Sequence, residues 1–344
     1  MTTEFKDPHA WFIVKSDDGD TQTVYNNETK DNNYPFAFEV NFSDQPTPAQ
    51  NSVTLYNVSQ EHRNFYKKGQ KCELAFNWGK SKKVLCQGYL SQTGVNQSDG
   101  TTDNIVITFT EGTDYKNIEA RKLRVEKKKK VNQYTTVKKK IPGKWVKKRI
   151  HYYTTEKGKN VGHYKYKKEY QKATYQKKRV KHKATKTFMV NMTFKKGKTY
   201  KQIITAVAAK SGIKITKINL HKNSAIKKAY TASGKPLTVL KSLVKRAESK
   251  MLYIRGDLTI MDPTDKKRSW FVITDDILMS PPTLDEDDEG TDTWQITTPL
   301  IPELTTLSGV IMQSKYLKGK FFVSTGQHTS DGTSPTSQVS IQAV

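Results

Sequence analysis

Lysine and arginine side chains are concentrated in one stretch of the sequence. Of the 59 in the whole chain, 26 lie in residues 121–186 with only three acidic residues, so this basic segment carries +23 of the formal net charge of +26. Tyrosines and one tryptophan are interleaved with these cations. Lysine neutralises phosphate groups and aromatic rings stack on bases, so the composition predicts binding of a polyanion.

Three kinds of partner fit the basic segment: nucleic acid, anionic wall polymers such as teichoic acid, and acidic surfaces of neighbouring subunits. A solvated ribbon without a specific partner is disfavoured, because so much like charge repels itself. Lysines outnumber arginines by 22 to 4, which favours diffuse neutralisation over bidentate recognition of bases. The residues predicted to bind the polyanion or acidic partner are Lys127, Lys128, Lys129, Lys130, Lys138, Lys139, Lys140, Trp145, Lys147, Lys148, Arg149, Tyr164, Tyr166, Lys177, Lys178 and Arg179.

The sequence has no recognisable catalytic or metal-ligating pattern. Its seven histidines lack the spacing of a zinc site, and it has no Cys-x-x-Cys, G-x-S-x-G, Walker or G-x-G-x-x-G motif. His328 and Asp331 could form an acid–base pair, but a turn-stabilising histidine at a strand end is favoured. The acidic run 285–289 could bind a hard cation, although a solvated loop or a partner for a lysine-rich surface is favoured. The sequence therefore predicts no enzyme, no metal and no cofactor.

The remaining composition limits the class of protein. The 344 residues suffice for two or three domains. The chain starts MTTEFKDPHAW, without the pattern of a secretory signal, and no run reaches the roughly 18–20 apolar residues of a membrane span. Cys72 and Cys86 are too few for a disulfide framework and are predicted to be free, buried thiols. We expect a protein made in a reducing compartment and not exported by the general route.

Outside the basic segment the chain is nearly neutral, with 33 basic and 30 acidic residues. Residues 1–112 predict a first β domain, a barrel or sandwich, because short alternating runs are separated by polar turns. One short helix is expected within residues 59–68. The predicted strands are residues 12–14, 36–40, 53–56, 72–78, 84–90 and 104–110.

Residues 113–190 hold the basic segment. Turn signals at 142–143 and 157–160 divide it into runs rich in Tyr, Val and Thr, which predict two long hairpins from residues 133–140, 144–155, 162–170 and 174–188. Cations fall on both sides of the alternation, so no face is apolar, and a two-stranded ribbon is marginal alone. We expect a protruding basic β-ribbon, partly ordered until a partner neutralises it.

The rest of the chain predicts two further domains. In residues 191–262, Thr199 and Gln202 form a capping box, residues 211–212 end that helix, and residues 213–220 follow as a strand. A second helix starts near Pro236, and strands at 251–255 and 258–261 pair across Gly256 and Asp257. Residues 263–344 return to β structure, with strands at 270–274, 294–298, 309–314, 320–324 and 338–343.

Several segments together resemble the baseplate or tail-hub proteins of contractile-tailed bacteriophages and of Gram-positive prophages, the late-control-D-like tail hub family. The first barrel of that family is matched by VTLYNVS (53–59), KGQKCEL (68–74), LCQGYL (85–90) and DNIVI (103–107). Its helical motifs are matched by residues 198–212 and 237–256, and its closing strand by YLKGKFFV (316–323) leading to HTSD (328–331). This chain departs from the family at two turns. LIPEL (300–304) stands where the family usually has Leu-Asn-Pro-x-Ile, and at the next turn the chain has Gly309 without the preceding glycine-valine pair.

The resemblance implies an α+β, mostly β chain with two tube-like β-barrel domains, a small αβ domain and the basic insertion. It implies a homotrimer in which six barrels form a ring that joins the tail tube protein to the central spike or tail lysin, beside other baseplate proteins. The protein would be made in the host cytoplasm and reside in the virion. Open barrel edges would meet neighbouring subunits, at Val53, Leu55, Tyr56, Phe321, Phe322 and Val323.

A competing hypothesis comes from the basic segment alone. The chain could be a stand-alone, non-specific nucleic-acid-binding protein with the β domains as scaffold. An enzyme that cuts peptidoglycan is a more distant alternative.

Overall fold

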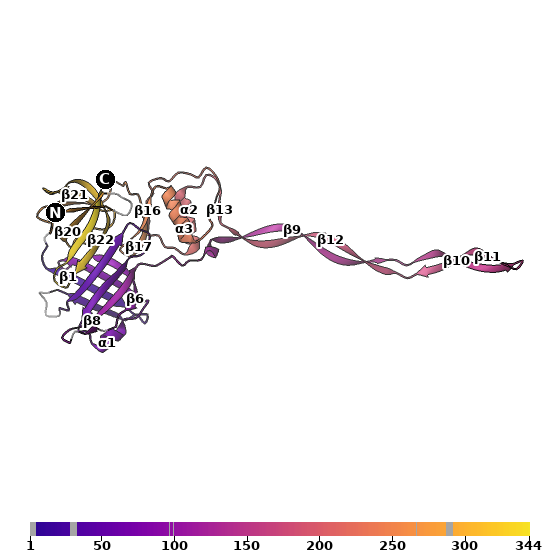
Figure 1. The fold of residues 1–344 in the computed structure, drawn as a ribbon, viewed down its shortest axis with the longest axis horizontal. Helices are drawn as coiled ribbons and strands as arrows, with labels where there is room; N and C mark the ends of the chain where they lie inside the picture. Colours follow the sequence, from indigo (N-terminus) through magenta and orange to yellow (C-terminus); the bar gives the residue numbers. More distant parts are fainter. Residues whose placement is uncertain (1–4, 28–32, 96, 99, 266, 287–291) are drawn as a thin grey trace. The chain divides into compact units, whose positions relative to one another are not determined.

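The computed structural model describes residues 5–27, 33–95, 97–98, 100–265, 267–286 and 292–344. The chain divides into two compact units: residues 1–123 with 191–344, here called the body, and residues 124–190, called the ribbon. Strands far outnumber helices in the chain (Figure 1), which confirms the predicted mostly β class. Among the described residues, no helix is both long enough and apolar enough to cross a membrane.

The N-terminal part of the body contains every strand predicted there. Alternation places one side of each strand inward, as in β3, where Phe36, Phe38 and Val40 are buried and join the first hydrophobic core. The predicted short helix is α1 (Gln60–Phe65), which begins where the Ser59 side chain accepts a hydrogen bond from His62 N. The strands are β1 (Pro8–Lys15), β2 (Thr21–Asn26), β3 (Phe36–Ser43), β4 (Gln50–Tyr56), β5 (Lys71–Trp78), β6 (Val84–Thr93), β7 (Gln97–Ser98) and β8 (Asp103–Glu111).

The C-terminal part of the body is also built of strands, and its core contains Ile296, Val310, Met312 and Ile341. The five predicted strands are present. A further strand, β19, was not predicted, and it includes the start of the acidic run 285–289. Residues 287–289 of that run lie outside the described residues. The strands are β18 (Trp270–Thr274), β19 (Thr283–Glu286), β20 (Asp292–Pro299), β21 (Gly309–Gln313), β22 (Lys318–Ser330) and β23 (Thr336–Ala343).

One sheet runs through both parts of the body. Strand β22 pairs antiparallel with β3, with His328 opposite Val40, so segments from opposite ends of the sequence lie side by side (Figure 1). The strand order is β19-β20-β23-β22-β3-β4-β8-β6-β5-β1-β2, with β18, β21 and β7 attached beside it. Strands β19 and β2 are the two ends of this order, and in the part of the chain that the structure describes no hydrogen bonding joins them. The two separate closed barrels therefore stay a prediction.

A small αβ part of the body lies between these segments in sequence. The capping box predicted for α2 is present, with Gln202 N bonded to the Thr199 side chain, and the helix ends at left-handed Gly212, φ 75°. Pro236 is the first residue of α3, and Leu240 and Leu243 are buried against α2 and its neighbours. The elements are α2 (Tyr200–Ser211), α3 (Pro236–Arg246), η1 (Ala120–Leu123), β13 (Thr193–Phe194), β14 (Lys217–Ile218), β15 (Tyr230–Thr231), β16 (Lys250–Ile254) and β17 (Asp257–Met261).

Two local predictions for this part need correction. The strand expected over residues 213–220 shrinks to β14, two residues parallel to β17. The β16–β17 hairpin turns one residue earlier than expected: Ile254 pairs with Asp257, and the turn is made by Arg255 and Gly256, with φ of 54° and 95°. Two positive φ angles match a type I′ turn, which suits the right-handed twist of a two-residue hairpin.

This turn is fixed against the end of β8. The Oε1 atom of Glu111 accepts a hydrogen bond from Gly256 N at 3.0 Å, and the Tyr253 hydroxyl donates to the Thr113 carbonyl at 2.7 Å. Burial raises the pKa of the Glu111 carboxyl to about 7, although backbone N–H groups donate to it. The first β part and the αβ part of the body therefore share a buried polar joint.

The ribbon consists of two successive two-stranded sheets. Strand β9 (Arg124–Ile141) pairs with β12 (Thr174–Asn191), and β10 (Lys144–Glu156) pairs with β11 (Lys159–Gln171). The four predicted strands are present. Their pairing is nested, because β10–β11 is a hairpin that lies in sequence between β9 and β12. The two long hairpins that were expected are therefore one hairpin and one pair of distant strands.

Candidate polyanion interface

The candidate interface is the β10–β11 hairpin, whose register is set by its turn. Glu156 pairs with Lys159, and Lys157 and Gly158 make a two-residue turn with φ of 50° and 77°. From there the pairing continues without a bulge to Lys144 opposite Gln171. Because opposed residues in an antiparallel pair lie on one face, the register assigns every side chain to one of two faces.

The first face, here called the ring face, carries most of the aromatic side chains. It contains the pairs Trp145–Tyr170, Arg149–Tyr166 and His151–Tyr164, together with Tyr153. Opposed rings contact each other across the two strands: the centroids of Trp145 and Tyr170 are 5.2 Å apart, and those of His151 and Tyr164 are 4.5 Å apart. The ring face therefore forms a ladder of aromatic groups.

A cation is integrated into this ladder. The guanidinium carbon of Arg149 lies 3.4 Å from the centroid of the Tyr164 ring, a cation–π contact. Opposite Tyr153 stands Gly162, and a side chain there would meet the His151 ring. Glycine at this position leaves room for His151 to lie against Tyr164 and Tyr153.

The second face, called the acid face, contains both carboxylates of the hairpin. Glu169 forms a 3.3 Å ion pair with Lys148, and Glu156 closes the hairpin. Its cations are Lys144, Lys148, Lys159, Lys165 and Lys167, and its only tyrosine is Tyr152. The ring face has just Lys147, Arg149 and Lys168 but no carboxylate. Each face thus carries a formal charge of +3, and the rings, not the charge, distinguish them.

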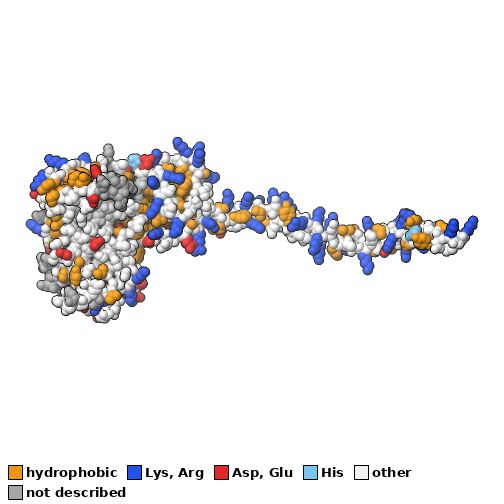
Figure 2. Space-filling model, viewed as in Figure 1, with side chains coloured by type: hydrophobic (Ala, Val, Ile, Leu, Met, Phe, Trp, Pro, Cys, Tyr) orange, Lys and Arg blue, Asp and Glu red, His pale blue; other side chains and the backbone are white. Residues whose placement is uncertain are grey.

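The rings of the ring face are available to a partner. Tyr166, Trp145 and Tyr153 are 67%, 66% and 65% exposed. Figure 2 shows lysine and arginine side chains projecting along the ribbon, with hydrophobic side chains between them. A polyanion can therefore meet cations and open rings on the same surface.

The predicted partner-binding residues are distributed over all four strands of the ribbon. The ring face brings together Trp145, Lys147, Arg149, Tyr164 and Tyr166, whereas Lys148 lies on the acid face. The other predicted residues lie on β9 and β12, where they are exposed: Lys127, Lys128, Lys129, Lys130, Lys138, Lys139, Lys140, Lys177, Lys178 and Arg179. The predicted set leaves out Tyr153, Lys168 and Tyr170, which counting alternate residues back from Lys157 and forward from Gly158 places on the ring face.

The residues predicted to contact neighbouring subunits lie mostly in the cores. Val53, Leu55, Phe321 and Val323 are buried, and Tyr56 and Phe322 are half-buried. Neither segment is a sheet edge: β4 pairs with β3 and β8, and β22 pairs with β21, β23 and β3. A subunit contact here stays a prediction, and Tyr56 and Phe322 offer the surface for it.

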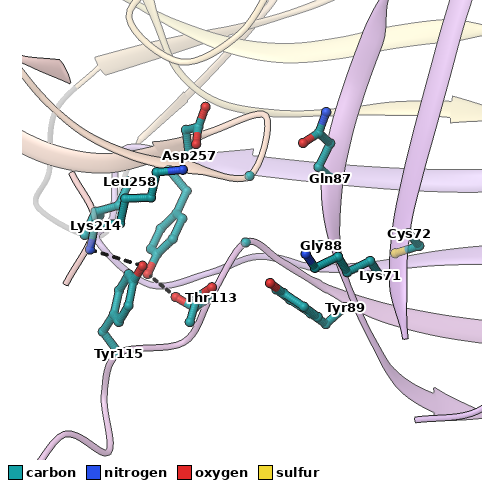
Figure 3. A pocket seen from close by; sticks show the side chains of 13 residues that line it. Lys71, Cys72, Gln87, Gly88, Tyr89, Thr113, Tyr115, Lys214, Asp257 and Leu258 are labelled. Carbon is teal, nitrogen blue, oxygen red and sulfur yellow. Dashed lines mark hydrogen bonds between the residues drawn. The ribbon is translucent and has the colours of Figure 1, made fainter. Parts of the chain in front are cut away.

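The body also has a pocket of about 290 Å³ beside the polar joint (Figure 3), between the β5–β6 strands and the β16–β17 hairpin. Tyr115 accepts a hydrogen bond from Lys214 N at 3.3 Å on one wall, and Cys72 lines another. Both cysteines are free and buried, as predicted. Burial raises the pKa of the Cys72 thiol to about 12, so it stays protonated at neutral pH and is a poor nucleophile.

His328 and Asp331 do not form an acid–base pair. His328 is buried within β22, where its Nδ1 lies 2.8 Å from Ser337 Oγ. Burial, with a smaller contribution from the charge of Arg255, lowers the pKa of His328 to about 3. Asp331 stabilises the following turn instead, since it accepts from Thr333 N and Ser334 N. The expected turn-stabilising role thus belongs to Asp331.

Comparison with known proteins finds similarity in structure only. No family model matches the chain, and no curated protein matches it by sequence. The 43 kDa tail protein of prophage MuSo2 from Shewanella oneidensis is similar at a TM-score of 0.56 and 10% identity, over 97% of this chain and 98% of that one. The tail protein from Neisseria meningitidis MC58 is similar at 0.54 and 9% identity, over 96% of each chain. The chain therefore has the fold of these phage tail proteins.

Proposed function

We propose that this chain is a structural component of a phage or phage-like tail, a baseplate hub that forms a homotrimeric ring between the tail tube and the central spike. The observation that carries the proposal is the similarity in fold to two prophage tail proteins over nearly the whole length of each. Partial matches often reflect a shared motif, whereas these two extend over 97% and 96% of this chain. The protein would reside in the virion baseplate.

The body suits a mechanical role. Its N-terminal and C-terminal strands share one sheet through the β22–β3 pairing, so a load on either part is carried by backbone hydrogen bonds. Three hydrophobic cores support a division into a first barrel domain (1–112), an αβ domain (191–262) and a second barrel domain (263–344), with the insertion at 113–190. We propose that the two barrels contribute to the ring and that the basic insertion contacts a polyanion or an acidic partner.

Sedimentation of the purified chain tests the hub. At physiological salt, the expected mass is three times the chain mass of 39.3 kDa. A matched variant replaces residues 124–190 by a short glycine-containing turn. Met192 N already donates to the Leu123 carbonyl at 3.0 Å, so the body brings both ends of the deletion together. A trimer in both proteins supports the hub, and a monomer in both over a wide concentration range contradicts it.

The second candidate function is non-specific nucleic-acid binding by a chain that acts alone. The lysines and tyrosines of the ribbon favour it. Such a protein would be monomeric and would hold duplex DNA at about 150 mM salt, with affinity falling steeply and linearly on a log–log plot. A trimer that releases duplex DNA at this salt concentration favours the hub.

A further inference from the structure

We infer that the ring face of the β10–β11 hairpin is a binding surface for single-stranded nucleic acid. The inference rests on the proposed contact of the insertion with a polyanion, and it specifies which surface and which polyanion. Its first support is the sorting of side chains by the hairpin register: the two faces carry equal formal charge, but five of the six aromatic Trp and Tyr residues of β10 and β11 lie on one of them. Diffuse attraction to charge alone needs no such sorting.

Exposed rings identify a partner with flat, unpaired groups. Trp145, Tyr153 and Tyr166 are each about two-thirds exposed although large rings gain by burial. A base can stack on such rings, and each stacked base contributes about fivefold or more to affinity. In a duplex the bases are already stacked on one another, so the ring face should prefer single strands. An acidic protein surface would use the lysines and leave the rings unused.

The hydrogen-bonding groups distinguish nucleic acid from a sugar-bearing wall polymer. Sugar hydroxyls donate as well as accept hydrogen bonds, and carboxylates are the strongest side-chain acceptors for the protons that they donate. The ring face has no carboxylate, since Glu156 and Glu169 are both on the acid face. It offers the donors of Lys147, Arg149 and Lys168. Phosphate oxygens and base carbonyls accept from such donors, so the ring face matches a nucleic-acid strand.

The hairpin supplies a closely matched pair of charge variants. Lys147 pairs with Lys168 on the ring face, and at the next position Lys148 pairs with Lys167 on the acid face. Lys147→Gln with Lys168→Gln, and Lys148→Gln with Lys167→Gln, remove the same charge from neighbouring positions on opposite faces. Binding of a fluorescein-labelled oligothymidylate to each full-length variant is measured by anisotropy. The ring-face variant should weaken binding at least threefold more than the acid-face variant.

Ring variants and modified ligands complete the test. Trp145→Ala and Tyr166→Ala should each weaken oligothymidylate binding about fivefold or more, whereas Tyr152→Ala on the acid face should change it less than twofold. Trp145→Phe and Tyr166→Phe should restore most of the affinity, which a merely unfolded hairpin would not explain. An abasic oligomer of equal length, with the same phosphates and no bases, should bind more weakly and be insensitive to the ring variants.

Three results would overturn the inference. Equal weakening by the two charge variants would mean diffuse attraction. Equal binding of abasic and base-bearing strands would remove the role of stacking. Tighter binding of a purified teichoic acid than of oligothymidylate, at equal phosphate concentration, would assign the surface to the cell wall. None of these outcomes changes the sedimenting mass, so failure of this inference and failure of the hub are separate results.

Discussion

The side chain of Glu111 and the backbone of Gly256 meet across 145 positions of sequence, through a 3.0 Å hydrogen bond that joins the end of β8 to the β16–β17 turn. The carboxyl is buried, and no ion pair with it is found among the described residues. Its raised pKa shows that the folded protein favours the protonated form. This joint leads to the first two predictions.

The contribution of Glu111 to the stability of the body should fall as pH rises from about 4.5 to about 7. Glu111 has a pKa near 4.5 when unfolded and about 7 when folded, so the folded state binds the extra proton within this window. The contribution is fully present below the lower value and is lost above the higher one. Urea unfolding at pH 5 and pH 8 measures it. Glu111→Gln keeps an acceptor for Gly256 N and removes this contribution, so relative to the unaltered protein the variant should lose less stability between pH 5 and pH 8. An equal change in the two proteins would contradict the assignment.

Gly256→Ala should destabilise the body by more than about 3 kcal/mol, because strain and overlap add at this position. A Cβ atom there would overlap the Gln87 carbonyl, and the backbone has a φ of 95°. Gly197 has nearly the same φ, 94°, with no atom near its missing Cβ. Gly197→Ala should therefore cost only about 1–2 kcal/mol. Thermal unfolding of both variants separates overlap from strain, and equal losses would refute the close packing at Gly256.

Acid should destabilise the body through His328. Its pKa falls from 6.5 to about 3 on folding, so the folded state keeps the ring neutral while the unfolded state takes up a proton. This contribution is present above about 6.5 and is lost as pH falls toward 3. His328→Gln cannot titrate and should lose less stability between pH 7 and pH 4 than the unaltered protein. Equal losses in the two proteins would show that other groups cause the acid sensitivity.

The two long helices of the body should respond in opposite ways to changes at their first residues. Thr199→Ala removes the capping box of α2 and should cost about 1 kcal/mol. Lys235, which precedes α3, makes no side-chain cap hydrogen bond, so Lys235→Asp should stabilise by about 0.5–1 kcal/mol. Denaturant titration measures both. A loss at Lys235 as large as at Thr199 would contradict the assigned helix starts.

The elements of the body were predictable because their signals are local. Alternating apolar residues locate β3 and β5, and the Thr199–Gln202 pair locates α2. Partners of strands were harder to predict. Nothing near residue 322 indicates that Phe321 and Phe322 pair with both β21 and β23, which makes this segment interior and places Val323 in the core instead of at an edge.

The candidate site was predictable in composition but not in arrangement. Runs such as Lys127–Lys130 identify a polycationic segment, and their consecutive lysines point to alternate faces. Because both faces are cationic, no apolar pattern sets the register of the strands. Only the turn at Lys157 and Gly158 does so. Alternation alone places Tyr152 and Tyr153 on opposite faces, but without the register nothing indicates which of them shares a face with Tyr164.

The β22–β3 pairing also has a consequence for biosynthesis. Strand β3 emerges early from the ribosome, but one of its two hydrogen-bonding edges has no partner until residues 325–330 of β22 have been translated. At about 5–20 residues per second this delay lasts roughly 15–60 seconds. Meanwhile the exposed edge can pair with the same strand of another nascent chain. Production of soluble protein should therefore depend on chaperones that occupy this edge, and slower translation of the long insertion would extend the period of risk.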